Sequence, residues 1–194
     1  MLSVSTTVVA VVAVPAGDGG PLDQVRATNV RVLRPATGAA PLERAMTAYD
    51  EARHTSTPYL LHDADPLAWV AEAWARRFEE RGAAGDLEVA VAETLARWRA
   101  RSVDLPDYYL VVDPEGFSPV LRHWFLGVLA SAAPTRVVTG RPGTPVVDHL
   151  ADLRPGPWWP DLDRVLDGID RVLPEQAGRG SVPPALGSDR VPQG

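Results

Sequence analysis

The chain has 194 residues, 25 acidic and 19 basic side chains, a formal charge of −6 and no cysteine. All of the basic side chains are arginine, as a GC-rich bacterial coding bias produces, so this lysine-free chain can use neither a lysine Schiff base nor a phosphate-loop lysine. The lack of cysteine excludes thiol nucleophiles and thiolate zinc sites, and the acidic balance argues against sequence-independent binding of nucleic acid.

The apolar segment at residues 1–16 predicts neither a membrane span nor a signal peptide. It carries no basic residue and ends in a proline and glycine turn after a run that is too short to cross a bilayer. No other uncharged run approaches the roughly 20 residues that a membrane helix needs. We therefore expect a cytoplasmic protein that contacts neither a membrane nor nucleic acid, and its oligomeric state is left open.

Short aliphatic runs alternate with segments of helical period along the chain. In chain order they predict a strand over 8–14, a strand over 29–33, a helix over 42–52, a strand over 59–62, helices over 67–78 and 87–102, a strand over 108–112, a helix over 120–132, a strand over 136–139 and a helix over 161–173. Strands that alternate with helices predict an α/β fold with a mainly parallel sheet of about five strands and right-handed crossovers.

The domain organisation follows from where these patterned segments end. We expect a single three-layer α/β domain over residues 1–173, in which the last helix docks on the core through one apolar stripe. Residues 174–194 have no aromatic side chain and are rich in glycine, proline and serine. Such a composition buries too little apolar surface to offset the entropy of ordering, so it predicts a disordered tail.

Acidic residues follow two of the expected strands. Asp63 and Asp65 come after the third strand, and Asp113 and Glu115 come after the fourth. If these strands are parallel neighbours, the four carboxylates meet at one edge of the sheet, where they would hold a hard cation such as Mg²⁺ or Mn²⁺. The alternative is a set of turns and helix starts, with Asp65 as the N-cap of the next helix.

The motif Asp63-Ala64-Asp65 resembles the DxD element of nucleotide-sugar glycosyltransferases. The order of strand, glycine-containing turn, helix and strand from Asn29 to Asp65 is also similar to the middle of that fold. The resemblance implies that the two acids hold Mg²⁺ or Mn²⁺ against the diphosphate of a nucleotide sugar.

Aromatic residues give the clearest sign of a contact surface. Three of the six tryptophans fit core-facing helix stripes, whereas Trp69 falls off the stripe of its helix. Trp158 and Trp159 are adjacent on a proline-bracketed link, where both cannot easily be buried. Exposed aromatic residues of this kind are typical of protein contact surfaces. Arg122, on an otherwise apolar helix, either marks the strip that meets solvent or binds an anion or a partner carboxylate.

The residues leave two functions open. No standard catalytic motif is complete in the sequence, so the leading hypothesis is a non-catalytic interaction or accessory module that needs no cofactor and binds a partner protein through Trp69, Arg122, Trp158 and Trp159. The alternative is an enzyme that depends on Mg²⁺ or Mn²⁺ and acts on a phosphorylated or nucleotide-sugar substrate through Asp63, Asp65, Asp113 and Glu115.

Overall fold

Five parallel strands form the centre of the computed structural model, which describes residues 6–14, 20–35, 38–79 and 81–174. They are β1 (Thr7–Val12), β2 (Val30–Leu33), β3 (Tyr59–His62), β4 (Tyr108–Val112) and β5 (Val137–Gly140), and they pair in the order β2-β3-β1-β4-β5. The aliphatic runs of β1, β3 and β4 are buried on both faces of the sheet, as is typical of parallel sheets. The expected α/β class and parallel sheet are confirmed.

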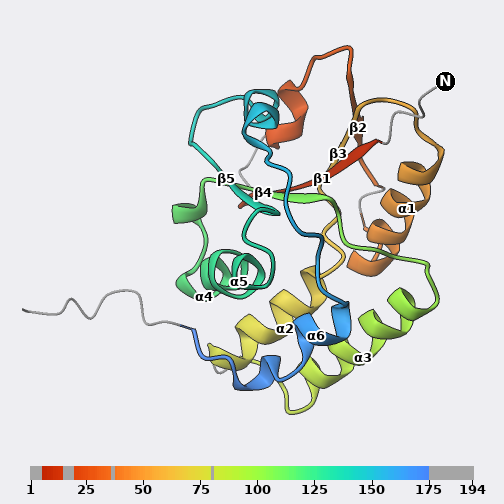
Figure 1. Ribbon diagram of the computed structural model, residues 1–194. Helices are drawn as coiled ribbons and strands as arrows, with labels where there is room; N and C mark the ends of the chain where they lie inside the picture. The colour runs from red at the N-terminus through yellow and green to blue at the C-terminus, as the bar shows by residue number, and fades with distance from the viewer. Residues whose placement is uncertain (1–5, 15–19, 36–37, 80, 175–194) are drawn as a thin grey trace, which may run out of the picture.

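The α-helices of the described residues lie on one side of the sheet, and the 3₁₀ helices η1 and η4 cover the other side (Figure 1). The α-helices are α1 (Pro41–His54), α2 (Ala68–Phe78), α3 (Asp86–Arg99), α4 (Pro119–His123), α5 (Ala130–Ala132) and α6 (Leu162–Leu166). The other helical turns are η1 (Pro21–Gln24), η2 (Pro114–Gly116), the π-helical η3 (Trp124–Leu129), η4 (Val146–Asp152) and η5 (Ile169–Arg171). The protein therefore has three layers, one of them thin.

The handedness of the connections explains this uneven covering. Right-handed crossovers that run toward opposite edges of a parallel sheet pass over opposite faces. The β1–β2 connection, which contains η1, runs toward the β2 edge. The three later connections run toward the β5 edge and carry α1, then α2 with α3, then α4 with α5. The η4 segment follows β5 and returns over the face that η1 covers.

Each face of the sheet has its own apolar core. The larger core, on the helical side, is built around Trp74 and Trp124, which are fully buried. The smaller core joins Val11 of β1 to Leu22 of η1 and Val146 of η4. Successive side chains of a strand point to opposite faces, so the same short strands supply both cores.

The helix expected over 120–132 is present, but its middle is wound as a π-helix. The stretch η3 lies between α4 and α5 and contains Gly127. A Cβ atom at Gly127 would lie 2.6 Å from the ring of His123, one π-wound turn earlier. Only glycine allows the His123 ring to lie this close to the backbone.

The last helix is shorter than the sequence pattern predicts. α6 ends at Leu166, and Gly168 has a left-handed φ of +68° before η5 begins. The prediction of one helix over 161–173 is wrong because it follows the apolar spacing alone, which continues across this break. The apolar stripe still docks on the core, and Trp74 Nε1 donates a 3.0 Å hydrogen bond to the carbonyl of Ile169.

The expected disordered tail, residues 174–194, lies outside the described residues apart from Pro174. Within the described part of the chain, no helix is long and apolar enough to cross a membrane.

Replacing Gly168 by alanine is expected to destabilise the docked end of the chain. A left-handed φ costs a residue that has a Cβ about 1 kcal/mol more than it costs glycine. No neighbouring atom lies within 4 Å of that Cβ, so a steric clash adds nothing. Urea denaturation should show a loss of about 1 kcal/mol in the free energy of unfolding. The matched control, Gly20→Ala at φ −91° in equally open surroundings, should be nearly neutral, and equal effects of both substitutions would contradict this prediction.

Candidate functional site

A cavity of about 460 Å³ lies at the carboxyl ends of β1, β2 and β3. The end of β1, the segments that follow β2 and β3, and the helical run after β4 all line it. The chain leaves β1 toward one edge of the sheet and later passes to the other side of β1, so the cavity lies where the direction of the connections reverses. Open parallel sheets bind their ligands at this position.

Most of the cavity wall is apolar. Phe117 and Phe125 come from the segment after β4, and their ring centroids are 5.6 Å apart. The other apolar residues of the wall are Val11, Val12, Ala13, Val14, Pro21, Leu22, Pro35, Ala68, Ala71 and Leu121. A wall of this kind excludes water from a ligand and strengthens its interactions with a few polar groups.

Two arginine residues on the cavity are held in ion pairs. Arg34, directly after β2, lies 2.7 Å from a carboxylate oxygen of Asp23 and also donates a 2.8 Å hydrogen bond to the carbonyl of Leu22. Arg44, on α1, lies 2.8 Å from a carboxylate oxygen of Asp63. These pairs are partly exposed and add little stability, but each neutralises one cation of the cavity.

Asp65 is the buried charged residue of the cavity, with 8% of its surface exposed. Its Oδ1 atom accepts a 2.8 Å hydrogen bond from the backbone N–H of Leu67, which makes an Asx turn ahead of α2 rather than an N-cap. The same oxygen accepts a 2.8 Å hydrogen bond from the hydroxyl of Tyr109 on β4. Within the described residues Oδ2 has no hydrogen-bond partner, so this oxygen is available to a ligand.

Burial raises the pKa of Asp65 from 3.8 to about 6, and the charge of Glu72 adds to the rise. The hydrogen bonds from Leu67 and Tyr109 act in the opposite direction because they stabilise the carboxylate. Burial, together with the charge of Asp65, raises the pKa of Tyr109 well above its usual value, so its hydroxyl remains a donor. Asp65 can therefore take up or release a proton near neutral pH, a property that clusters at functional sites.

His62 is the last residue of β3, and it lines a different cavity from Asp65. That cavity has about 190 Å³ and lies beside α1. Burial lowers the pKa of His62 to about 4, so its ring is neutral at neutral pH. Its Nδ1 atom accepts a 3.2 Å hydrogen bond from the N–H of Ala64. His62 therefore adds no charge to the cavity at the carboxyl edge.

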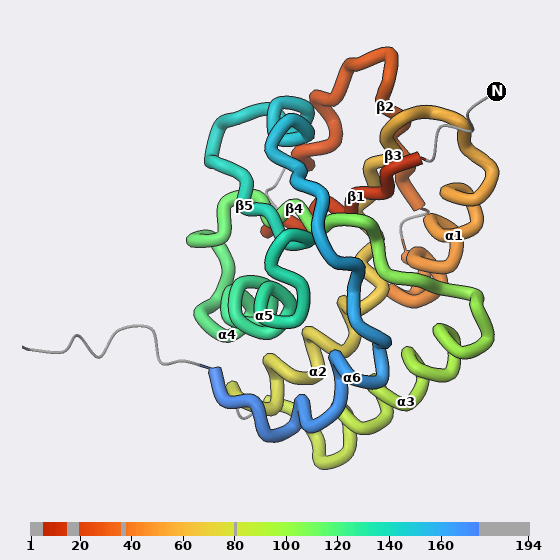
Figure 2. The backbone as a smooth tube through the Cα atoms, in the orientation of Figure 1, coloured from red at the N-terminus to blue at the C-terminus, as the bar shows by residue number. Residues whose placement is uncertain are grey.

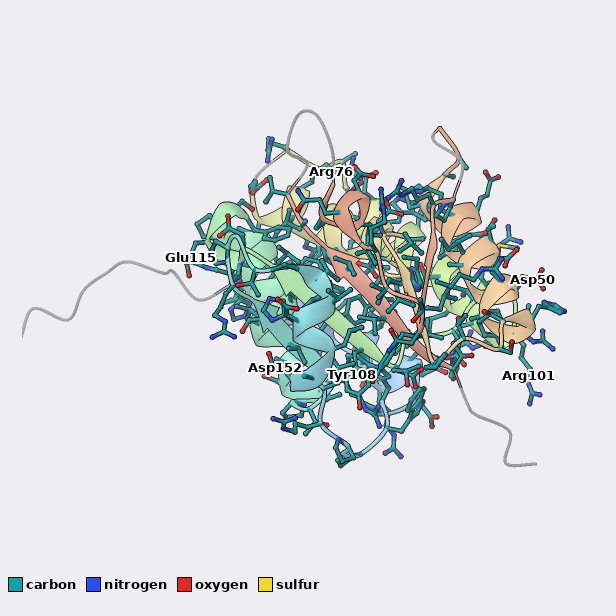
Figure 3. All side chains as sticks on the ribbon, turned by 90° about the horizontal axis from the view of Figure 1, so that it is seen from above. Asp50, Arg76, Arg101, Tyr108, Glu115 and Asp152 are labelled. Atoms are coloured by element: carbon teal, nitrogen blue, oxygen red, sulfur yellow. The ribbon has the colours of Figure 1, made fainter. Side chains whose placement is uncertain are left out.

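The structure brings together two of the four carboxylates predicted to share a metal ion. Asp63 and Asp65 line the cavity at the carboxyl edge. Glu115 lies over a separate groove, where it pairs with Arg122. In Figure 3 Glu115 is on the opposite side of the molecule from Asp50 of α1, the helix that supplies the partner of Asp63.

The strand order explains this separation. β1 stands between β3 and β4, so the ends of β3 and β4 are two strand spacings, about 10 Å, apart. Asp113 follows β4, is exposed and has a left-handed φ of 48°. Within the described residues, no three His, Asp or Glu side chains are placed to share a metal ion. Support for a metal therefore comes from Asp63 and Asp65 alone, and both already accept hydrogen bonds.

Trp159 is buried, so the prediction that it belongs to an exposed surface is wrong. It has 6% of its surface exposed, and its Nε1 donates a 2.7 Å hydrogen bond to the carbonyl of Pro106. Its ring packs edge-on against Tyr109. Trp158 is 52% exposed, and the guanidinium carbon of Arg136 lies 4.8 Å from its ring centroid. Adjacent side chains of a non-helical link point in different directions, so burial of one leaves the other outside.

The other residues predicted to bind a partner lie apart from Trp158. The link that carries Trp158 runs from η4 across the sheet to α6 (Figure 2). Trp69 is half-buried in a hollow between α1, α2 and α3. Arg122 lines the groove between α4 and the end of the described chain. The structure therefore does not join the predicted residues into one surface.

Sequence reasoning missed four charged residues that line the cavity at the carboxyl edge, which are Asp23, Arg34, Arg44 and Glu72. It also missed Tyr109, which is not part of the lining but donates a hydrogen bond to Asp65. Tyr109 carries a usable signal, because a tyrosine in a strand that is buried on both faces needs a partner for its hydroxyl. The four charged residues carry none, since charged residues at helix surfaces and strand ends are common.

A scan against protein-family models and searches of curated proteins and of solved structures found no match to this chain. The cavity and its buried carboxyl group are thus the features from which a function can be inferred.

Asp65→Asn is expected to change how the stability of the fold depends on pH. Between about pH 4 and about pH 6 the folded state binds more protons than the unfolded state, so ionisation of Asp65 lowers the stability of the wild type as pH rises. A pKa change from 3.8 to about 6 corresponds to roughly 3 kcal/mol. Asparagine cannot ionise, so the stability of the variant relative to wild type should rise by up to that amount across this interval.

Urea denaturation at a series of pH values measures this difference. His62 acts with the opposite sign, because its lowered pKa makes stability fall as pH falls from 6.5 toward about 4, but it is present in both proteins and cancels. The matched control is Asp148→Asn, which removes an exposed charge from η4 and so measures the effect of net charge alone. If the stability difference between Asp65→Asn and the wild type did not vary with pH, the burial of Asp65 would not raise its pKa and this prediction would be wrong.

Proposed function

We propose that this protein binds a small organic molecule in the cavity at the carboxyl edge of the sheet, with Asp65 as the group that exchanges a hydrogen bond or a proton with it. The observation that carries the proposal is the state of this carboxyl group. It is buried in a largely apolar wall, one oxygen is fixed by Leu67 and Tyr109, and Oδ2 has no partner within the described residues.

The size and composition of the cavity support a small-molecule ligand. Its volume of about 460 Å³ falls in the range of ligand sites, and such sites combine apolar walls with a few convergent polar groups. A carboxyl group that served only to form the turn before α2 would need neither a raised pKa nor a cavity beside it. The proposal therefore gives Asp65 a role that its local hydrogen bond to Leu67 does not require.

The chemistry available to Asp65 is proton exchange. A pKa of about 6 leaves the group mostly ionised at neutral pH, where it can accept a proton, and lets the protonated form donate one at slightly lower pH. The hydroxyl of Tyr109 keeps Oδ1 in place and stabilises the carboxylate. A ligand with an amino or hydroxyl group can therefore donate a hydrogen bond to Oδ2.

The metal-dependent alternative would use the same cavity. Asp63 and Asp65 would hold Mg²⁺ or Mn²⁺ against a phosphorylated or nucleotide-sugar substrate. It has less support, because Asp63 would first have to leave Arg44.

A thermal-shift titration distinguishes these alternatives. We expect compounds from a panel of small amines, alcohols, nucleosides and nucleotide sugars to raise the melting temperature of the wild type. A ligand at a hundredfold excess over its dissociation constant adds about 2.7 kcal/mol of stability. The same compounds should have a much smaller effect on Asp65→Asn, whereas the control Asp148→Asn should respond as the wild type does.

Each outcome of this titration bears on one of the two proposals. If no compound raises the melting temperature, or if Asp65→Asn responds as fully as the wild type, the proposed role of Asp65 is wrong. A rise that needs Mn²⁺ or Mg²⁺ and is lost in Asp63→Asn would favour the metal-dependent alternative.

A second proposal, partner binding, is carried by Trp158 alone. An exposed tryptophan over a guanidinium group has the composition of an interface hot spot. Trp158→Ala should cost less than about 1 kcal/mol of stability, since it removes one cation–π contact with Arg136. Affinity capture should lose a specific partner in Trp158→Ala and keep it in the control Val89→Ala, which truncates another exposed apolar side chain, 58% exposed. Retention of every specific partner by Trp158→Ala would contradict this second proposal.

A further inference from the structure

The positive and negative charges that line the cavity at the carboxyl edge are not equal in number. Its lining contains four carboxyl groups and two guanidinium groups, which are Asp23, Asp63, Asp65, Glu72, Arg34 and Arg44. Arg34 and Arg44 are each within 3 Å of one carboxylate, at 2.7 Å and 2.8 Å. Those pairs use Asp23 and Asp63, so Asp65 and Glu72 are the two carboxyl groups of the described lining without a cationic partner.

Asp65 and Glu72 act on the same part of the cavity. Both line the cavity, Asp65 from the turn ahead of α2 and Glu72 from one turn into α2, which begins at Ala68. Burial is the main cause of the raised pKa of Asp65, and the charge of Glu72 adds to the rise. A cation bound between the two would relieve this repulsion.

Aromatic rings complete the surroundings of these two acids. The rings of Phe117 and Phe125 are 5.6 Å apart, and the ring of Tyr109, whose hydroxyl bonds to Asp65, lies 6.3 Å from that of Phe125. Aromatic faces beside carboxylates attract organic cations, because both carry negative electrostatic potential. An anionic ligand would meet the opposite situation, since it would have to break an ion pair to reach Arg34 or Arg44.

We infer that the ligand of this cavity is an organic amine, bound as an ammonium ion by Asp65 and Glu72 with its apolar part against Phe117 and Phe125. This inference rests on the proposed small-molecule function and adds the charge and class of the ligand. The ammonium group donates to Oδ2 of Asp65, while Oδ1 stays bonded to Leu67 and Tyr109.

Three probes of matched shape test the inference on the full chain. They are 2-phenylethylamine, 2-phenylethanol and phenylacetate, which share one ring and differ in the charge of the polar end. Isothermal titration at neutral pH should give an affinity for the amine about tenfold or more above that for the alcohol, and a still weaker affinity for the anion. The affinity for the amine should fall as pH is lowered through the pKa of Asp65.

Glu72→Gln is the discriminating variant. Glu72 is exposed, so the substitution leaves folding intact, and it should weaken binding of the amine severalfold while leaving binding of the alcohol unchanged. The control Asp148→Asn removes one negative charge from η4, on the other face of the sheet, and should bind all three probes as the wild type does. This control separates a local effect of Glu72 from a change in net charge.

The outcomes separate this inference from the function on which it rests. The amine assignment is wrong if the alcohol or the anion binds as tightly as the amine or more tightly. It is also wrong if all three probes fail to bind. In each of these cases the small-molecule function stands if other compounds still stabilise the wild type and fail with Asp65→Asn. If the wider panel fails as well, both proposals are wrong.

Discussion

The position of β1 between β3 and β4 constrains most of the structure around it. Because parallel connections are right-handed, the chain can leave β1 toward β2 only over one face and must return toward β5 over the other. All of the connecting α-helices therefore gather on one side, and the η1 and η4 segments are left to cover the second side. The same reversal leaves a cavity at the carboxyl end of β1.

The hydrogen bond between Tyr109 and Asp65 spans this central position. Tyr109 stands on β4 and Asp65 follows β3, so their 2.8 Å contact joins the two sides of β1 on the helical face of the sheet. It stabilises a buried carboxyl group that would otherwise be costly, and it uses Oδ1, so that Oδ2 has no partner within the described residues. The cavity, the perturbed carboxyl and the aromatic wall thus depend on one arrangement of strands.

The sequence predicts the parts of this arrangement that depend on local pattern. Aliphatic runs locate the strands, and the rule that ligands bind at carboxyl ends places Asp63 and Asp65 at the site. The grouping of Asp113 with them fails because the pattern does not reveal that β1 separates β3 from β4. Tyr109 is missed for a similar reason, since 44 residues separate it from Asp65 and strand register is not a local property.

The most direct test of the central claim is an NMR titration of the Asp65 carboxyl carbon in the intact protein, assigned with Asp65→Asn. The structure predicts a midpoint near pH 6. It also predicts a higher midpoint in Tyr109→Phe, because the lost hydrogen bond stabilises the carboxylate. A midpoint near pH 4 that Tyr109→Phe leaves unchanged would contradict both the burial of Asp65 and its place in the proposed site.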